Sequence, residues 1–367
     1  MHESESELHT TILPKKNIVL RQLKQVSNPR SIHGIYPYRG KMSAIDAAQV
    51  ISQLPANSTL LDPFCGTGTI VYEAQIHGMN AIGIDNNPIA CTIASGKIQP
   101  IDRTSTITSL KKAIRNAQQL SKVKSMPDSP AKFFHNTTAN QIMRILTISS
   151  EFPPFLLSSF YGSVCLAARA CNHWLWTSTS VGKIATPLRQ VDFYSMLLRK
   201  TLKHIEYIIG TPPAQIYNYD ARKVKNLLPS GSIDIVYTSP PYFDALDYTG
   251  YYTRLVMEIL EIDRERVREG LIQRYSTYKD EMKKALSAID RVLHDESVVI
   301  FVVGDRMVHK KLIRGSDVFQ EIAPWADPYI VEREYTKTAS ELWDSINTTK
   351  RKEQVIVWDL AIGGRKQ

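Results

Sequence analysis

The chain has 367 residues, of which 43% are hydrophobic and 22% charged, and its formal net charge is +9 at pH 7. This length and composition are those of a folded protein with a large buried core, which excludes a disordered or low-complexity chain. Apolar runs stay below the roughly 18–20 residues that a membrane-spanning helix needs, so no membrane segment is expected.

The first 99 residues open an α/β sheet after a polar lead-in over residues 1–30. A turn-rich, aromatic and basic loop comes next at 31–42, and Ser43 is placed to cap a helix that ends before Pro55. Strands are predicted at 59–61 and 81–84, each followed by a loop and a helix, with helices from Ile70 to Gly78 and over 89–97. This alternation is typical of a doubly wound sheet.

Residues 100–212 break this rhythm. Helical periodicities cover about 105–122, 136–149, 156–172 and 187–209, and strand signals are scarce. Between residues 101 and 200, 13 Lys and Arg stand against 4 Asp and Glu, a surplus that equals the net charge of the whole chain. We therefore predict a basic helical insertion that contacts a polyanion, with a solvated helical face as the alternative.

The α/β rhythm returns in residues 213–367. Strands are predicted at 215–220, 233–238, 297–303, 329–335 and 354–362, and helices at about 249–262, 277–293 and 315–324. The continuous apolar run from Ser297 to Val303 is typical of a central parallel strand. The expected fold is a mixed seven-stranded α/β sheet in two halves, 31–99 and 213–367, separated by the helical insertion.

Acidic residues end three strands of the predicted sheet. Asp62 begins the loop Asp62-Pro-Phe-Cys-Gly-Thr-Gly-Thr69, whose glycines allow positive φ and leave backbone uncovered near a ligand. The spacing is neither GxGxxG nor GK[ST], which disfavours a phosphate cradle. Asp85 is placed to hydrogen-bond ribose hydroxyls, and Asp220 could meet an adenine amine. Together they fit a nucleoside with a cationic amino-acid tail, S-adenosylmethionine, although each loop taken alone could be a structural turn.

The turn Thr238-Ser-Pro-Pro-Tyr242 ends another strand. Neither Pro240 nor Pro241 can donate to a sheet ladder, so the strand stops there and the turn is stiff. The Ser239 hydroxyl, the proline carbonyls and the Tyr242 ring would then suit a flat ring that carries an amine, such as a nucleobase. An ordinary proline-ended turn is the alternative for this motif in isolation.

These motifs together resemble those of the DNA amino-methyltransferases, which methylate an exocyclic base amine with S-adenosylmethionine as donor. The family's cofactor loop, DPFxGxGT, is matched by residues 62–69, and its catalytic motif, [D/N/S]PP[Y/F], by residues 239–242. Residues 33–42 resemble its N-terminal cofactor motif, and 244–248 resemble the segment after SPPY in bacterial members. The similarity covers residues 31–97 and 215–305 and implies a Rossmann-like methyltransferase sheet.

The resemblance also implies roles for single residues. Ser239 and the Pro240 carbonyl would hydrogen-bond the target amine, and Tyr242 would stack on the base. The implied catalytic residues are Ser239, Pro240, Pro241 and Tyr242. The implied cofactor-binding residues are Tyr36, Pro37, Asp62, Phe64, Gly66, Gly68, Thr69, Asp85, Asn86, Asp220 and Ala221.

Ser239 bears on the choice of base. The first catalytic position in this family is usually Asp or Asn in adenine-N6 enzymes and Ser in cytosine-N4 enzymes, so we expect methylation of cytosine N4. The cofactor half precedes the catalytic half here, whereas many cytosine-N4 members have the reverse order. Adenine-N6 methylation, RNA base amino-methylation and a non-catalytic nucleic-acid-binding relative are the alternatives.

The basic insertion would then be the DNA-binding surface. The residues expected to contact phosphates are Lys111, Lys112, Arg115, Lys122, Lys124 and Lys132. Candidates for base contacts are Arg169, Asn172, His173, Trp174 and Trp176, with packing between helices as the alternative for the tryptophans. The target base must be flipped out of a duplex or already single-stranded.

The cellular setting is inferred from motifs that the sequence lacks. The nine histidines show no HxxxH or equivalent cluster, so no metal is expected. Four cysteines without CxxC pairing and a polar N-terminus without a signal peptide's apolar segment indicate a cytoplasmic protein. The resemblance implies a restriction–modification setting, in which a cognate restriction endonuclease would be the partner.

Overall fold

The structure is a computed structural model that describes residues 31–38, 42–175, 184–242, 249–250, 253–308, 311–335 and 351–366. Several expectations lie outside these residues: the lead-in 1–30, Trp176, and the segment 244–248. The N-terminal cofactor motif is described without residues 39–41. Within the described residues, none of the helices combines the length and apolar character needed to cross a membrane.

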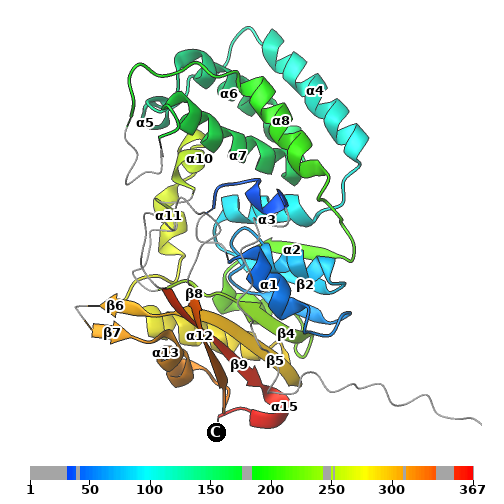
Figure 1. Ribbon diagram of the computed structural model, residues 1–367, viewed down its shortest axis with the longest axis vertical. Helices are drawn as coiled ribbons and strands as arrows, with labels where there is room; N and C mark the ends of the chain where they lie inside the picture. The colour runs from blue at the N-terminus through cyan, green and yellow to red at the C-terminus, as the bar shows by residue number, and fades with distance from the viewer. Residues whose placement is uncertain are drawn as a thin grey trace, which may run out of the picture.

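Seven strands form one mixed sheet in the order β3-β2-β1-β4-β5-β9-β8 (Figure 1). Their bounds are β1 Thr59–Asp62, β2 Asn80–Asp85, β3 Ala214–Asn218, β4 Ile233–Thr238, β5 Leu293–Gly304, β8 Tyr329–Tyr335 and β9 Arg351–Asp359. Pairing is parallel from β3 to β5, and β9 runs antiparallel to both β5 and β8. The predicted mixed seven-stranded, doubly wound sheet is confirmed.

Helices cover both faces of this sheet. α1 (Ala44–Ile51), α2 (Thr69–Ile76) and α3 (Pro88–Ile98) pack on one face, and η3 (Ala221–Asn226), α12 (Tyr278–Asp290) and α13 (Gly315–Ile322) pack on the other. Consecutive strand residues point to opposite faces, so Leu60 joins one core and Leu61 the other. Burial on both faces explains why the central strands are continuous apolar runs rather than alternating ones.

The helical insertion forms a lobe above the sheet, on the side of α3 (Figure 1). It comprises α4 (Arg103–Gln119), α5 (Asp128–Ala131), α6 (Asn136–Ile148), η2 (Ser149–Glu151), α7 (Pro154–Cys171) and α8 (Phe193–Ile205). α7 seats against α3 so closely that a Cβ on Gly96 would lie 2.2 Å from Ser158 Oγ. A Cβ on Gly162 would lie 1.8 Å from the carbonyl oxygen of Ile35, which comes directly after the short helix η1 (Ser31–Gly34).

α10 (Arg254–Ile259), which comes after the insertion and β4 in the sequence, also contacts the lobe. It packs on α5 and α7. Ser129 Oγ donates to the Glu258 carboxylate at 2.8 Å, and Lys124 forms an ion pair with Glu261, just beyond the end of α10. α11 (Arg264–Glu269) comes next and leads to residues 271–272. The lobe is therefore held in place by α3, which precedes it in the sequence, and by α10, which follows it.

Several predicted bounds were wrong because side-chain caps end or begin the elements. The predicted strand 354–362 ends at Asp359, whose carboxylate accepts from the amide of Ala361 at 3.1 Å and begins α15 (Leu360–Gly363). The helix predicted from 187 begins at Phe193, because Asp192 caps it. Ser43 stands before α1 as predicted but makes no side-chain cap bond. The elements α5, α11, β6 (Arg306–Val308) and β7 (Lys311–Ile313) were not predicted.

Candidate active site

A cleft opens at the carboxyl ends of the parallel strands, where the strand order reverses between β1 and β4. Its empty space is about 800 Å³, a figure that includes the open solvent at its mouth. Four strand-end loops line it: 63–66 after β1, 85–87 at the end of β2, 219–221 after β3 and 239–242 after β4. Tyr38, Leu271 and Ile272 complete the wall.

The loop after β1 depends on its two glycines. Gly66 and Gly68 adopt φ values of 50° and 72°, in the left-handed region that side chains rarely occupy. Gly68 is also the N-cap of α2, where a Cβ would lie 2.8 Å from the Cβ of Ala94. Gly66 lines the cleft, whereas Gly68 and Thr69 lie behind it, buried against α3. Gly68 therefore shapes the loop from behind.

Asp62 joins the ends of two strands. Its Oδ1 accepts from the Thr238 hydroxyl at 2.6 Å and from the amide of Phe64 at 3.2 Å. The side chain is 2% exposed, and this burial raises its pKa from 3.8 to about 7, with a smaller contribution from the nearby charge of Asp85. The carboxyl lies behind Pro63 and Phe64, which face the cleft.

Asp85 lies on the wall itself. Its Oδ2 accepts from the amide of Gly66 at 2.9 Å and its Oδ1 from the amide of Asn87 at 2.8 Å. Burial raises its pKa to about 6, although both amide hydrogen bonds act in the opposite direction. A carboxylate can accept at about four lone-pair positions, so these two bonds leave capacity for ligand hydroxyls.

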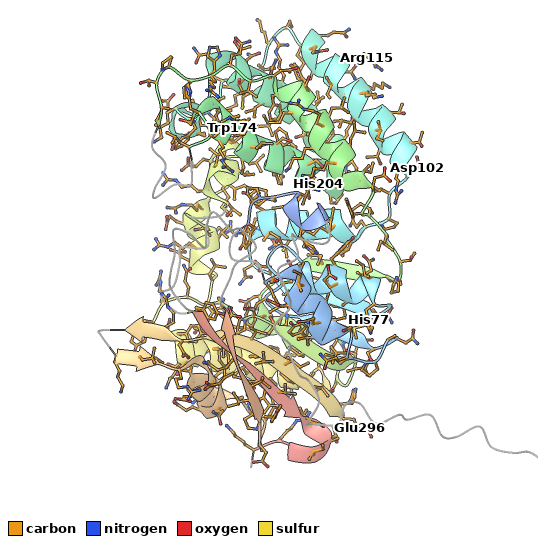
Figure 2. All side chains as sticks on the ribbon, viewed as in Figure 1. His77, Asp102, Arg115, Trp174, His204 and Glu296 are labelled. Carbon is orange, nitrogen blue, oxygen red and sulfur yellow. The ribbon has the colours of Figure 1, made fainter. Side chains whose placement is uncertain are left out.

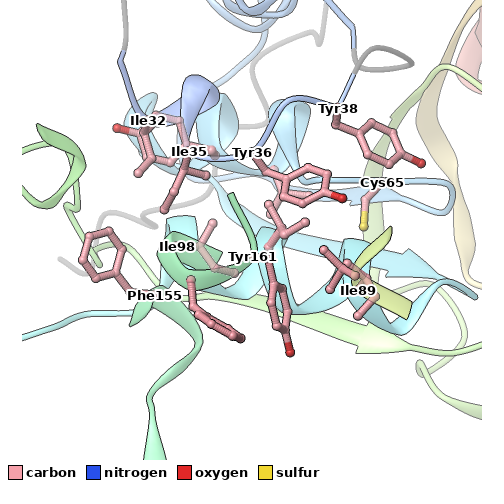
Figure 3. Packing of buried hydrophobic residues seen from close by; sticks show 14 of the residues in the cluster. Ile32, Ile35, Tyr36, Tyr38, Cys65, Ile89, Ile98, Phe155 and Tyr161 are labelled. Atoms are coloured by element: carbon pink, nitrogen blue, oxygen red, sulfur yellow. The ribbon is translucent and has the colours of Figure 1, made fainter. Parts of the chain in front are cut away.

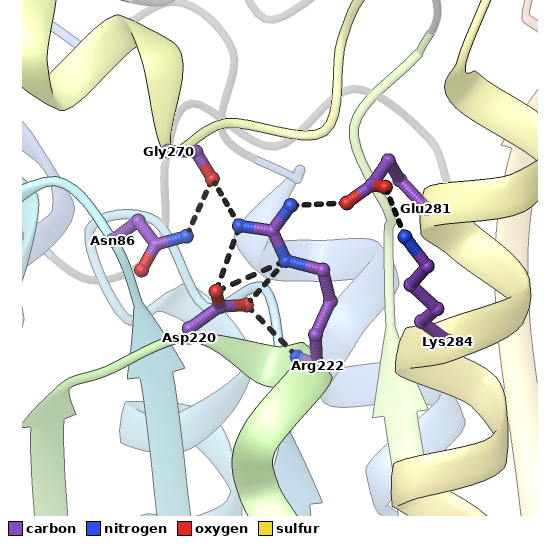
Figure 4. Close-up of polar contacts among 6 residues, drawn as sticks. All are labelled: Asn86, Asp220, Arg222, Gly270, Glu281 and Lys284. Carbon is purple, nitrogen blue, oxygen red and sulfur yellow. Dashed lines mark hydrogen bonds and ion pairs between the residues drawn. The ribbon is translucent and has the colours of Figure 1, made fainter.

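Asp220 lines the cleft but its charge is already paired (Figure 4). It caps η3 and accepts from Arg222 Nε and Nη2 at 2.7–3.0 Å. The same guanidinium forms an ion pair with Glu281 and donates to the carbonyl of Gly270 at 3.1 Å. Asn86 Nδ2 donates to that carbonyl as well, at 2.9 Å, so two side chains hold the segment that carries the 271–272 wall.

The SPPY turn lies opposite these acids. Ser239 and Tyr242 are half-buried and line the cleft, and no described residue hydrogen-bonds to the Ser239 hydroxyl. The carbonyl of Pro241 accepts from the Tyr278 hydroxyl at 2.7 Å, which fixes the turn to α12. Two of the polar groups expected to meet a base amine therefore differ. The Pro241 carbonyl already accepts a hydrogen bond from Tyr278, whereas Ser239 faces the cleft.

The N-terminal aromatic loop contributes a different residue from the one expected. Tyr36 is buried beside α7, where its hydroxyl meets the Cys165 thiol, and burial raises the pKa of Tyr36 well above its usual value. Pro37 is exposed. Tyr38 lines the cleft, with its ring edge 3.7 Å from the position of a Cβ on Gly66 (Figure 3). The loop has no regular alternation at this point, and its backbone directs Tyr38, and not Tyr36, to the cleft.

Other cleft residues were missed by the sequence. Leu271 and Ile272 come after α11, far along the chain from the cofactor motifs, and their composition carries no signal of a ligand wall. Tyr219 and Asn87 are neighbours of predicted residues, so the strand-end rule could have found them. Phe64, Asn86 and Ala221 were predicted and do line the cleft.

The residues predicted to contact nucleic acid come from several elements of the lobe. Lys111, Lys112 and Arg115 are exposed on α4, whereas Lys124 pairs with Glu261 at the end of α10. Lys122 and Lys132 are exposed in the links between the first helices of the lobe. Arg169 Nε donates to the carbonyl of Trp174 at 3.1 Å, near the end of α7. Figure 2 shows Arg115 and Trp174 on opposite sides of the lobe.

The chemistry of the cleft is compatible with S-adenosylmethionine. Its walls combine apolar side chains, among them Phe64, Leu271 and Ile272, with the carboxylates of Asp85 and Asp220, which can accept hydrogen bonds. The acids carry no counter-ion from the described chain except at Asp220, which suits a cationic ligand better than a phosphate. In the described part of the chain, no group of three or more His, Cys, Asp or Glu side chains is arranged to hold a metal ion.

The strand order, the cleft and the two motifs that line it define the class of S-adenosylmethionine-dependent amino-methyltransferases. The family model for D12 class N6 adenine-specific DNA methyltransferases matches residues 41–300. The match covers more than half of the chain, and the chain belongs to this family. The predicted membership of the DNA amino-methyltransferases is confirmed, and S-adenosylmethionine is the cofactor of the family.

Curated relatives point the same way. The type II methyltransferase M.MjaII of Methanocaldococcus jannaschii is 33% identical over 93 residues, 25% of this chain and 17% of that protein. The type II methyltransferase M.BsoBI of Geobacillus stearothermophilus is 23% identical over 341 residues, 81% of this chain and 65% of that protein. The chain thus spans less than two thirds of either relative.

Solved structures add a distant similarity. The rRNA methyltransferase aviRa from Streptomyces viridochromogenes is 12% identical, with 95% of this chain and 96% of that chain covered. The TM-score is 0.35, which is too low to support an argument about substrate.

Proposed function

We propose that this chain transfers a methyl group from S-adenosylmethionine to the exocyclic amine of a base in DNA, and that the base is cytosine, methylated at N4. The observation that carries the proposal is that SPPY lines the same cleft as Gly66, Asp85 and Asp220. A base held at Ser239 would therefore meet a cofactor held at the acids. Such positioning of two reactants can supply roughly 7–11 kcal/mol of the barrier reduction.

The residues of the turn have separate tasks in this proposal. The Ser239 hydroxyl and the Pro240 carbonyl accept hydrogen bonds from the amine and draw its nitrogen towards tetrahedral geometry, which frees the lone pair for attack. Tyr242 stacks on the ring. The hydrogen bond from the Tyr278 hydroxyl to the Pro241 carbonyl would keep the turn in position when the base enters. The cofactor supplies an electrophilic methyl group bound to a sulfonium.

Other residues would hold the cofactor. Asp85 would accept from the ribose hydroxyls and Asp220 from the adenine amine, with Leu271 and Ile272 covering the ring. Asp62, whose carboxyl lies behind Pro63 and Phe64 and accepts from the Thr238 hydroxyl, would favour the ammonium end when ionised. Tyr38 would close the cleft above Gly66. Tyr36, Pro37, Gly68 and Thr69 would support these contacts from behind.

Adenine N6 is the second candidate. The description of the family names N6 adenine-specific enzymes, which favours adenine. Ser239 favours cytosine, because the family's adenine enzymes usually carry Asp or Asn at that position. Both bases present an exocyclic amine next to a ring nitrogen, so the same turn could serve either.

The deciding experiment is incubation of the protein with unmethylated genomic DNA and tritiated S-adenosylmethionine, followed by digestion to nucleosides. Label in 4-methylcytosine supports the proposal, and label in 6-methyladenine changes the base. Transfer to RNA alone, or no transfer to either nucleic acid, would sink the DNA methyltransferase proposal. A reaction without protein gives the background.

The biological setting is also a proposal. Both curated relatives are type II methyltransferases by name, which supports a restriction–modification role in the cytoplasm with a cognate restriction endonuclease as partner. Protection of methylated DNA from a nuclease encoded beside this chain would test that setting.

A further inference from the structure

The end of α7 holds a tryptophan in an unusual position. Trp174 is 54% exposed and has a φ of 66°, and the preceding His173 has a φ of 53°. Bulky side chains rarely adopt this left-handed conformation, which glycine usually serves at the end of a helix. Such backbone persists only where the surrounding structure fixes it, and it is concentrated at functional sites.

Hydrogen bonds fix the backbone on both sides of Trp174. Its amide donates to the carbonyl of Arg169 at 2.8 Å, and Arg169 Nε donates back to the carbonyl of Trp174 at 3.1 Å. Asn172 is fully buried, donates to the carbonyls of Phe133 and Ala168, and accepts from the amide of Ala185 at 3.1 Å. The chain is held firmly while the indole ring stays in solvent.

The surface around the ring is apolar at its centre and basic at its edge. We call it the α7 tip, made of residues 172–175 and 184–189. Leu175 and Ile184 are 42% and 41% exposed, and Arg169, Arg189 and Lys132 are exposed beside them. The amide of Arg189 donates to the carbonyl of Cys171 at 2.8 Å, which joins the second segment of the tip to the end of α7. The described residues 169–175 and 184–190 contain no Asp or Glu.

The tip lies on the side of the lobe that leads to the cleft. Figure 2 shows Trp174 on the side where α5 and α10 lie in Figure 1, whereas Arg115 of α4 lies on the other side. α10 packs on α5 and α7, and α11 then leads to Leu271 and Ile272 on the cleft wall. A long ligand that reached the cleft along α10 and α11 would pass the α7 tip and leave α4 uncovered.

We propose that the α7 tip is a DNA-contact surface, on which Trp174 stacks against a base or sugar and Lys132 and Arg189 contact phosphates. An exposed aromatic ring with cations beside it, in segments 169–175 and 184–190 that carry no Asp or Glu, is complementary to a nucleic acid. This inference rests on the proposed function for its choice of DNA, and it selects the tip over α4 as the side that DNA occupies.

The test measures binding of full-length variants to fluorescein-labelled fragments of unmethylated genomic DNA by anisotropy. Trp174→Ala should weaken binding about tenfold, and Trp174→Phe should retain most of the affinity, because stacking needs only an aromatic face. Lys132→Gln and Arg189→Gln should each lower the salt slope of binding by about one. Tyr329→Ala, which removes a ring that is 40% exposed on β8, is the control and should bind like wild type.

A glycine variant separates binding from folding. Trp174→Gly relieves the strained backbone, so its melting temperature should equal or exceed that of wild type while its DNA affinity falls as in Trp174→Ala. S-adenosylmethionine affinity should not change in any tip variant. A loss of DNA affinity that tracked a loss of melting temperature across the variants would overturn the inference.

Two further outcomes are decisive. If Trp174→Ala binds and methylates DNA like wild type while Lys111→Gln/Lys112→Gln/Arg115→Gln loses affinity, DNA lies along α4 and the inference fails alone. If the wild-type protein binds the cofactor but neither binds nor methylates DNA, the proposed function fails and takes the inference with it.

Discussion

Arg222 holds both carboxylate oxygens of Asp220, with nitrogen–oxygen distances of 2.7–3.0 Å. The same guanidinium reaches the carbonyl of Gly270 and the carboxylate of Glu281. One side chain thus sets the direction of a cleft acid and the position of the wall at 271–272. Arg222 is not among the residues that line the cleft, so we predict that it positions Asp220 and the wall without touching a ligand.

Arg222→Lys should raise the KM for S-adenosylmethionine about tenfold with little change in kcat, because an ammonium cannot reach Asp220, Gly270 and Glu281 together. Steady-state kinetics with saturating DNA would measure the split. Lys284→Ala removes the exposed lysine that also pairs with Glu281 and is the control, expected to be kinetically silent. The positioning role would be contradicted if Arg222→Lys lowered kcat as strongly as it raised KM, or if Lys284→Ala changed both constants to the same extent.

Cofactor affinity should rise with pH between about 5 and 7. Burial raises the pKa of Asp85 to about 6 and that of Asp62 to about 7, so both carboxyls are largely protonated at the lower limit. If ionised Asp85 accepts from ribose hydroxyls, the Kd should fall by up to about tenfold per pH unit below its pKa. Calorimetry across this range would measure it, and Asp85→Asn should bind weakly with a flatter profile.

The stability of the ligand-free protein should move the other way. Between the ordinary pKa of 3.8 and the raised values, the folded state holds protons that the unfolded state has lost. The contribution of these groups to the free energy of unfolding therefore decreases as pH rises through about 6 and 7. In Asp62→Asn, the free energy of unfolding should fall less as pH rises through this range. If its dependence on pH were the same as in wild type, Asp62 would not be the titrating group.

Ser239→Ala should abolish methyl transfer and spare cofactor binding, because the hydroxyl faces the cleft and no described residue hydrogen-bonds to it. Single-turnover transfer and calorimetric S-adenosylmethionine affinity provide the two readouts. Activity that survived in this variant would remove the serine from the mechanism.

Tyr278→Phe tests the anchor of the SPPY turn. Loss of the 2.7 Å bond to the Pro241 carbonyl should lower kcat about tenfold and stability by about 1 kcal/mol, since the acceptor becomes unsatisfied. The KM for the cofactor should not change. Chemical denaturation and single-turnover kinetics would give both numbers, and a variant that lost only stability would show that the turn keeps its shape without the anchor.

The sequence predicted most of the sheet because its central strands carry apolar runs, such as Val298–Val303, and several strands end at aspartate, proline or glycine. The loop after the first strand, the strand end at Asp85 and the SPPY turn could be placed at one edge of the sheet because each follows the carboxyl end of a strand, and Pro63, Phe64, Gly66, Asp85 and the turn do line one cleft. Their roles in binding and catalysis stay predictions. The specific base rests on Ser239 and the description of the family, which favour different bases.

Contacts between distant segments could not be predicted from the sequence. Asp220 was expected to meet a ligand directly, but in the structure its carboxylate already forms an ion pair with Arg222, two positions further along the chain. The choice between Tyr36 and Tyr38 depended on which way each residue of a loop points, and a loop has no fixed period. The wall at 271–272 depends on a tie between Asn86 and Gly270, which are 184 positions apart.

The close seating of α7 has a consequence for protein engineering. Gly96 and Gly162 let α7 lie directly against α3 and against the backbone at Ile35, with no room for a methyl group at either position. A chimaera that exchanged the whole segment 100–212 between relatives would bring a foreign α7 onto this contact and should misfold. Grafts that keep α3 and α7, and exchange only the helices of the lobe that do not touch α3, should leave this contact and the sheet intact.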